Sequence, residues 1–95
     1  MSSTFRWEVI TPEAMTASGE CEFLVVPAAG GQMGVLPGHA ALVALVVPGE
    51  LRVTTGGVVH AVPVGAGLVE VRDNTVRLLV MSASAGGSPP APPSP

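Results

Sequence analysis

The chain has 95 residues and a formal net charge of −3 at pH 7, and this length allows one small domain. Charged residues make up 12% of the sequence, about half of the ~25% usual in soluble domains. The acidic balance and the lack of a basic cluster argue against binding to nucleic acid, which requires a positive surface. With so few charges, we expect a partner to cover a sizeable face, unless the composition only reflects drift in a GC-rich genome.

Cysteine usage and hydropathy exclude several further classes of protein. Cys21 is the only cysteine, so an internal disulfide and a cysteine-pair metal site are excluded, and its strand context predicts an inert core thiol. The polar residues 1–4 are not followed by the apolar segment of a signal peptide. The longest apolar run, residues 40–48, is far shorter than the ~20 residues of a spanning helix. We therefore expect a soluble, intracellular protein without direct membrane insertion.

The first strands are predicted from alternating apolar residues and from the turns that separate them. Residues 5–10 alternate, and Trp7 and Val9 share the inner face of a half-buried strand. Trp7 is therefore expected in the core rather than at a nucleotide-stacking position. A second strand is predicted over residues 20–26, and its part 23–26 is apolar on both faces, which indicates a strand covered on both sides. The Pro- and Gly-containing segment 27–31 is predicted to be a loop.

The stretch from residue 31 to residue 42 concentrates the special backbone residues of the chain. Leu36-Pro37-Gly38-His39 predicts a type II turn, because proline presets φ at the second position and glycine supplies the positive φ at the third. Glycines on both sides of Met33 let the backbone bend around one apolar side chain. We expect a rigid loop here that feeds a buried strand over residues 40–47.

The second half of the chain predicts further short strands with tight turns. Strands are expected at 51–54, 58–64, 68–72 and 75–81, with hairpin turns at Gly56-Gly57 and Asp73-Asn74, and with Pro63 marking an edge strand or a bulge. The apolar period is two throughout, with turn signals about every 8–12 residues. The sequence therefore predicts an all-β fold, an antiparallel sandwich or barrel.

Residues 82–95 differ in composition from the rest of the chain. They carry no charge and five prolines, and the others are Ser, Ala or Gly. Such a segment buries too little apolar surface to order itself. We therefore expect one β-sandwich domain over residues 1–81 and a disordered, proline-rich tail over residues 82–95.

Side chains that could perform chemistry are sparse. His39 lies beside a turn, His60 lies in a strand, and neither has the partners of a nucleophilic triad or a metal site nearby in sequence. We expect no catalysis by this chain, no metal and no cofactor. His39 is expected either to hydrogen-bond the turn backbone or to contact a partner, and His60 to face solvent.

Four sequence elements, in order, resemble the N-terminal β domain of the epsilon subunit of bacterial F-type ATP synthase. They are the opening strand and turn VITPE (9–13), the string GQMGVLPGHA (31–40), the turn and strand PGELRV (48–53), and the closing segment GAGLVEV (65–71) with Asn74 and Val76. The string at 31–40 is the specific element, because a single Pro-Gly turn is common. The resemblance covers residues 5–81.

This resemblance implies a small two-sheet β-sandwich of about ten strands in the rotor, or central stalk, of the synthase. It implies binding to the gamma subunit and to the polar loops of the membrane ring, which would couple ring rotation to ATP synthesis without chemistry by the subunit itself. It also implies a peripheral location at the cytoplasmic face of the bacterial plasma membrane. By position, Thr11, Gln32 and His39 match family residues in loops that face the ring or gamma, and Leu42 matches the apolar residue that opens the following strand. With Met33, the apolar side chain between two glycines, these are the five candidate contact residues.

The chain departs from the family pattern at three places. Gln32 stands where an acid is common, which removes a charge from that contact, and Ala41 stands where proline is common. The tail at 82–95 stands where the family has a two-helix hairpin that inhibits ATP hydrolysis and, in some members, binds ATP. Because proline disfavours a helix interior by about 3 kcal/mol, we expect neither autoinhibition nor an ATP site from this tail.

Two other interpretations of the same residues remain. One is a free-standing β-sandwich that binds other proteins through the same turns, and the other is a catalytic β domain that uses His39. The extended string at 31–40 favours the rotor subunit over both, although a fold alone would not.

Overall fold

In the computed structural model, residues 3–84 are described and form nine strands with no helix. The strands, in chain order, are β1 (Phe5–Ile10), β2 (Met15–Cys21), β3 (Phe23–Ala28), β4 (Gly31–Val35), β5 (Leu42–Val46), β6 (Gly49–Thr55), β7 (Val58–Val64), β8 (Gly67–Arg72) and β9 (Thr75–Val80). The predicted all-β fold is confirmed. No helix in this part of the chain is long and apolar enough to cross a membrane.

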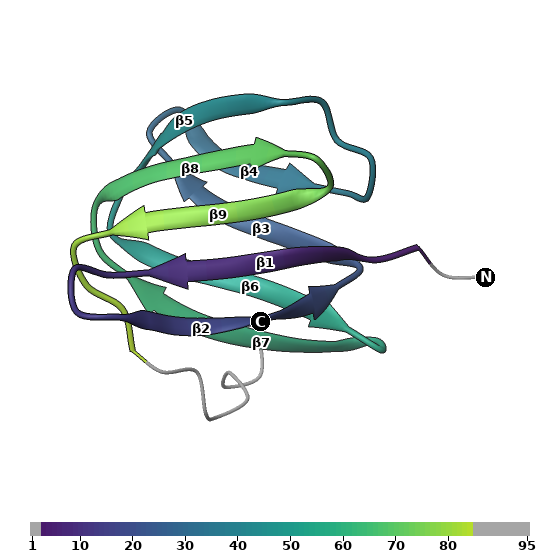
Figure 1. Cartoon of the computed structure of the whole chain (residues 1–95), viewed down its shortest axis with the longest axis horizontal. Coiled ribbons are helices and arrows are strands. Elements are labelled where there is room, and N and C mark those ends of the chain that lie inside the picture. Colours follow the sequence, from purple (N-terminus) through teal and green to yellow (C-terminus); the bar gives the residue numbers. More distant parts are fainter. Residues whose placement is uncertain (1–2, 85–95) are drawn as a thin grey trace.

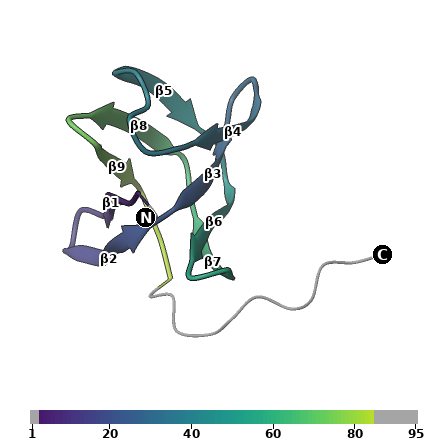
Figure 2. The same cartoon turned by 90° about the vertical axis from the view of Figure 1, so that its right-hand side faces the viewer.

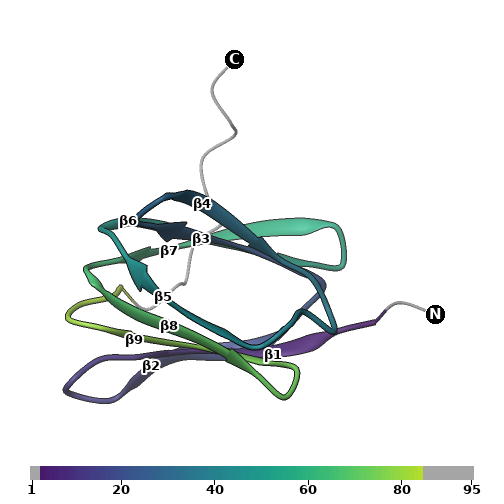
Figure 3. The ribbon, with the colours of Figure 1, turned by 90° about the horizontal axis from the view of Figure 1, so that it is seen from above.

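The strands form one hydrogen-bonded sheet that curls into two packed layers (Figures 1 and 2). The strand order is β2-β1-β9-β8-β5-β3-β6-β7. Strand β4 lies outside this order and pairs with β3. The first five strands of this order form one layer, and β3, β4, β6 and β7 form the other, as the view from above also shows (Figure 3). The single pair Ala28↔Val46 joins the layers. The sandwich is not wholly antiparallel, because β1 and β9 run parallel.

The core between the layers consists of valine and leucine side chains from alternate strand positions. Leu24, Leu51 and Leu78 are fully buried, and Val9 lies among them. Trp7 is also buried, as its place on the inner face of the first strand predicts. Removal of this apolar surface from water is the main force that holds the two layers together.

Cys21 ends β2 inside the core, as its sequence context predicts. Its side chain is fully buried, and no disulfide partner exists in the chain. Desolvation by burial raises the pKa of the Cys21 thiol to about 11. The thiol is therefore mostly protonated at neutral pH, and the thiolate, which is the reactive form, is disfavoured.

The tight turns follow the sequence expectation closely. Asp73 and Asn74 both have positive φ, at 53° and 57°, and Gly56-Gly57 has 57° and 79°, so both hairpins close with two left-handed residues. Gly38 has a φ of 77°, and the His39 N–H donates to the Leu36 carbonyl at 3.1 Å. These two observations confirm the type II turn.

Three sequence expectations for the strands are wrong. The segment over 20–26 is two strands that part at Glu22, where the chain crosses from one layer to the other. Gly31–Val35 is strand β4 rather than a loop, and the Phe23 ring lies 3.2 Å from the point where a Gly34 Cβ would be, so the ring fills the glycine's empty face. The strand after the turn is not buried on both faces, because alternate residues of β5 face solvent.

The segment after Met81 continues along β7. Gly65 N–H donates to the Ser82 carbonyl at 2.9 Å, Ser84 N–H donates to the Pro63 carbonyl at 3.1 Å, and Ala83 pairs with Val64. Residues 82–84 were expected to begin the disordered tail, but they are hydrogen-bonded to an edge strand. The remainder of the expected tail, residues 85–95, lies outside the described residues.

Candidate interaction surface

Two of the five candidate contact residues, Thr11 and Gln32, lie at the same end of the sandwich. Strands β1 and β3 both run toward this end, and Gln32 is the second residue of the return strand β4 (Figure 1). Thr11 is buried in the β1–β2 turn, where its N–H and its hydroxyl both donate to the Ala14 carbonyl, at 3.0 and 3.3 Å. Gln32 is exposed and follows Gly31, whose φ of 123° shapes the turn. Only Gln32 is therefore free to offer its side chain to a partner.

His39 lies at the opposite end, beside the β8–β9 turn. The Gly38 N–H donates to Asn74 Oδ1 at 3.0 Å, and Asn74 Nδ2 donates to the Thr4 carbonyl at 3.0 Å. One asparagine side chain thus ties the His39 loop to the start of β1 and to its own turn. The half-exposed His39 ring places Nδ1 2.8 Å from the Ala40 carbonyl oxygen. This contact provides the hydrogen bond to the neighbouring backbone that one alternative for His39 expects, and the contact with a partner stays a prediction.

Met33 and Leu42 both pack partly against the core. Met33 lies on β4 opposite Val26, and Leu42 begins β5 opposite Val71. Each side chain is half-buried and contacts the buried cluster. The structure therefore does not bring the five candidates into one patch: Thr11 and Gln32 share one end, His39 lies at the other, and Met33 and Leu42 face inward.

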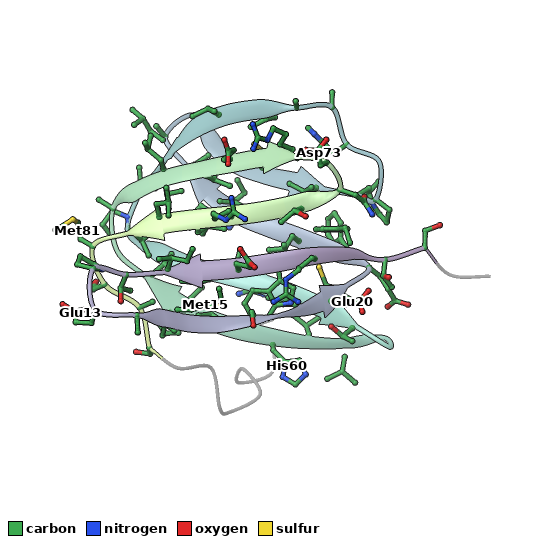
Figure 4. The ribbon with its side chains drawn as sticks, in the orientation of Figure 1. Glu13, Met15, Glu20, His60, Asp73 and Met81 are labelled. Atoms are coloured by element: carbon green, nitrogen blue, oxygen red, sulfur yellow. The ribbon has the colours of Figure 1, made fainter. Side chains whose placement is uncertain are left out.

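Exposed apolar side chains line up across the outer face of the β2-β1-β9-β8-β5 layer. Cross-strand register places Leu45 opposite Leu68, Leu68 opposite Leu79, Leu79 opposite Ile10, and Ile10 opposite Met15. Leu45 is 61% exposed, Met15 50%, Leu79 46% and Leu68 43%. We call these five residues the apolar row; Met15 is labelled at its β2 end in Figure 4. Such a contiguous apolar surface indicates an interaction site.

Charged residues form the neighbouring row of the same face. Glu70, Arg77 and Glu8 are cross-strand partners. Glu8 is buried and accepts hydrogen bonds from Arg77 Nε at 2.9 Å and from Arg6 Nε at 3.0 Å. The hydrogen bond from Arg77, and then that from Arg6, lowers the pKa of the Glu8 carboxyl. The outer face is thus divided into an apolar row near the Thr11 end and a charged row beside it.

Sequence reasoning predicted a covered face but missed the residues of the apolar row. Leu45 was counted in a buried strand, and Leu68 and Leu79 were not assigned a face. The signal that could have found them is apolar residues on both faces of β5 and β9, such as the adjacent pair Leu78 and Leu79. One face of such a strand covers the core, and the other must be covered by something else or exposed.

Within residues 3–84, no group of three or more His, Cys, Asp or Glu side chains could hold a metal ion. His60 is exposed on β7, as expected, whereas His39 follows Gly38, which is hydrogen-bonded to Asn74 in the β8–β9 turn of the other layer. The two histidines therefore do not meet in one site.

The model of the family "ATP synthase, Delta/Epsilon chain, beta-sandwich domain" matches residues 4–86 of the chain. This match spans all nine strands. The chain belongs to this family. The resemblance inferred from the string at 31–40 is confirmed.

Curated relatives carry the same assignment. The chain is 38% identical over 86 residues to the ATP synthase epsilon chain of Desulfitobacterium hafniense (strain DSM 10664 / DCB-2), a match that covers 90% of this chain and 65% of the relative. It is 42% identical over 82 residues to the ATP synthase epsilon chain of Afipia carboxidovorans, covering 86% of this chain and 60% of the relative. The chain thus spans about two-thirds or less of the length of these relatives.

Solved structures share the fold. A cryo-EM structure of Euglena gracilis mitochondrial ATP synthase, OSCP/F1/c-ring, superposes with a TM-score of 0.75 at 24% identity over 81% of this chain and 50% of that chain. The central stalk/c-ring structure of the Tetrahymena thermophila mitochondrial enzyme gives a TM-score of 0.69 at 19% identity, over 82% of this chain and 63% of that one. At these identities the likeness concerns the fold alone.

Proposed function

We propose that the chain is a non-catalytic, epsilon-type subunit in the central stalk of a bacterial F-type ATP synthase. In this role it links the gamma subunit to the membrane ring and so helps to couple ion-driven ring rotation to ATP synthesis. The protein is then peripheral, at the cytoplasmic face of the plasma membrane. The family membership and the names of the relatives support the assignment. The observation that carries it is the exposed apolar row, because a stalk subunit needs a partner-binding face.

The apolar row is proposed as the surface that binds gamma. Protein interfaces have apolar centres with polar rims, and this row has the charged row of Glu70, Arg77 and Glu8 along one side. The end that carries Thr11 and Gln32 is proposed to face the ring. Gln32 can offer a neutral amide to polar loops there, and the buried Thr11 holds the adjoining turn in shape.

The other candidates take different parts in this assignment. His39 is half-exposed at the far end and is proposed to contact gamma there, away from the ring. Met33 and Leu42 are proposed to support the loop between them from the core side, since both pack against the buried cluster.

Binding to purified gamma subunit from the same genome tests the proposal. Leu68→Glu places a charge in the middle of the apolar row, and we expect at least a tenfold loss of affinity, because the charge would be desolvated without a partner. Val58→Glu is the matched control: Val58 is 50% exposed on a strand, against 43% for Leu68, but it lies on β7 in the other layer. This control should bind within about twofold of wild type. Met33 is a poorer position for the charge, because its side chain packs against the core.

Circular dichroism must first show that both variants are folded. Equal affinity of wild type and Leu68→Glu would remove the apolar row from the gamma interface. Failure of the folded wild-type chain to bind gamma at all would overturn the stalk assignment and favour the free-standing binding module.

A further inference from the structure

A small pocket lies where β1 and β9 end, beside the apolar row. These two strands run parallel and pair Ile10 with Leu79, so both end at the side of the sandwich that carries Thr11. The pocket has a volume of about 270 Å³ and is lined by Ile10, Thr11, Pro12, Leu79, Val80 and Met81. Ile10 and Leu79 also belong to the apolar row, so the pocket continues that surface. Figure 4 labels Met81 at this end, on the same side as Glu13 of the β1–β2 turn.

Hydrogen bonds and a proline hold the walls of the pocket in place. On the β1 side, the Thr11 N–H donates to the Ala14 carbonyl at 3.0 Å and closes the turn that carries Pro12. The proline ring fixes φ within this turn. On the β9 side, the Met81 N–H donates to the Ala66 carbonyl at 2.9 Å. The pocket is therefore formed in the free chain, and a partner that enters it does not have to order its walls.

The lining of the pocket favours an uncharged, apolar occupant. Among residues 3–84, those that line it include no charged side chain, and Thr11 supplies the one polar side chain. The Thr11 hydroxyl already lies 3.3 Å from the Ala14 carbonyl oxygen and 3.3 Å from Thr16 Oγ1. A guanidinium or ammonium group in the pocket would lose its water without gaining an ion pair, which is costly. An arginine or lysine side chain is therefore a poor occupant.

The size of the pocket and its methionine favour one aromatic side chain as the occupant. Pockets that hold a whole small molecule usually measure about 300–1,000 Å³, and this one lies below that range. Met81 is 70% exposed, and a flexible thioether makes favourable contacts with aromatic rings. Leu79 is 46% exposed and adds apolar surface that an occupant would cover. Aromatic side chains bury the most apolar area per residue and dominate the energetics of protein interfaces.

We propose that this pocket, which we call the anchor pocket, receives one aromatic side chain of the gamma subunit. The inference rests on the proposed binding of gamma to the apolar row and adds the place where that binding is strongest. Interfaces concentrate their affinity in a few side chains that fill well-packed pockets, while the surrounding contacts exclude water. Leu45, at the far end of the apolar row, does not line the anchor pocket and therefore contributes less to binding than Met81.

Binding of purified gamma to two alanine variants of the full chain tests the inference. Met81→Ala removes one wall of the anchor pocket, and the exposure of Met81 makes a loss of folding unexpected. We expect at least a tenfold loss of affinity. Leu45→Ala is the matched control, because Leu45 is 61% exposed in the same apolar row but lies outside the pocket. Its loss should not exceed about threefold. Circular dichroism checks that both variants are folded.

Indole, a soluble mimic of an aromatic side chain, tests the anchor pocket on the full chain without gamma. In methyl NMR spectra, indole should shift the signals of Leu79 and Met81 about threefold more than the signals of Leu45. Saturating indole should also weaken the binding of gamma to wild type but not to Met81→Ala. The n-butylammonium ion, which mimics a lysine side chain, is the charged control and should produce neither effect.

The possible results separate this inference from the proposed function. If gamma binds wild type but loses equal affinity for Met81→Ala and Leu45→Ala, the anchor pocket is overturned and the apolar row remains the interface. Equal shifts of the Leu45, Leu79 and Met81 methyl signals would identify indole as an adventitious additive only and would also overturn the anchor pocket. Failure of folded wild type to bind gamma would overturn the proposed function and, with it, the occupant from gamma.

Discussion

At the scale of single residues, Glu8 shows how a charge can be accommodated on a strand of a low-charge protein. It lies on the outer face of β1 but is buried, because Arg77 and Arg6 close over its carboxylate with hydrogen bonds of 2.9 and 3.0 Å. Arg77 also approaches Glu70, at 3.6 Å, so the charged row is a connected network rather than an isolated pair. Such a network restrains its members jointly and is worth more than a single surface pair.

Glu8 should give the stability of the domain a dependence on acid pH. The pKa of its carboxyl is lowered in the folded state from an ordinary value of 4.5, first by the hydrogen bond from Arg77. The contribution of ionised Glu8 is therefore fully present above pH 4.5 and is lost as pH falls through the lowered folded-state pKa. We expect Glu8→Gln to lower the Tm at pH 7, and the difference from wild type to shrink steadily below pH 4.5.

Thermal unfolding followed by circular dichroism at several pH values checks this prediction. Glu13→Gln serves as the control, because Glu13 lies exposed in the β1–β2 turn. A difference between wild type and Glu8→Gln that stays constant down to pH 3 would contradict it.

The residues that the sequence could predict are those whose role is local. Gly38 and Asn74 were assigned to turns because only a few residue types tolerate positive φ, and both have it. The second role of Asn74, which ties the His39 loop to Thr4, depends on strands distant in sequence and was not predictable. The burial of Glu8 was missed for the same reason, since Arg77 reaches it from the other end of the chain.

At the scale of elements, the start of β8 is fixed by close contact with β9. A Cβ added to Gly67 would meet the Leu79 carbonyl and would lie 2.7 Å from the Val80 Cα, and both are backbone groups that cannot move aside. We expect Gly67→Ala to lower the free energy of unfolding by about 3 kcal/mol, as overpacking against backbone does. Gly30→Ala is the matched control, because a Cβ there meets nothing within 4 Å and its φ is not left-handed.

Urea denaturation of the two variants and of wild type measures these free energies. Gly30→Ala should remain within about 0.5 kcal/mol of wild type. If Gly67→Ala were equally neutral, the two strands would have room to separate, and the close approach would not constrain the fold.

The sequence predicted most strands but not how they divide between the layers. Strands β1 and β7 have the predicted bounds because alternation and flanking turns are local signals. The break between β2 and β3 was missed, because polar and apolar residues keep alternating through Glu22. Such an alternation does not show to which layer a strand belongs. Strand β4 was missed because Gly31 and Gly34 suggested a loop, and the Phe23 ring that covers Gly34 belongs to another strand.

At the scale of the whole molecule, the apolar row exists only after the strands are placed in register. Leu45, Leu68 and Leu79 come from three strands, and each could be read from sequence as a core residue. The low charge content predicted that some face would be covered, but only cross-strand pairing shows which face gathers exposed apolar side chains. Four of the five candidate contact residues, by contrast, came from resemblance to a family and Met33 from its two flanking glycines, and the fold separates the five between two ends and the core.

The parallel pairing of β1 with β9 joins the two ends of the described chain and should make unfolding all-or-none. Val9 lies opposite Leu78, and both side chains are fully buried between the layers. A substitution at Leu78 should therefore destabilise β1, which carries Trp7, as much as it destabilises the rest of the sheet. We expect Leu78→Ala to lower the free energy of unfolding by about 3 kcal/mol, through loss of apolar burial and the cavity left behind.

In urea, Trp7 fluorescence and far-UV circular dichroism should give coincident transitions for wild type and for Leu78→Ala, displaced by the same amount. Coincidence is expected because neither layer can keep its core covered once β1 and β9 separate: each strand buries its inner face against the other layer. A Trp7 transition that precedes the circular dichroism transition in the variant would show that β1 detaches alone. In that case the sandwich would be a stable antiparallel unit with β1 and β2 docked onto it, rather than one cooperative structure.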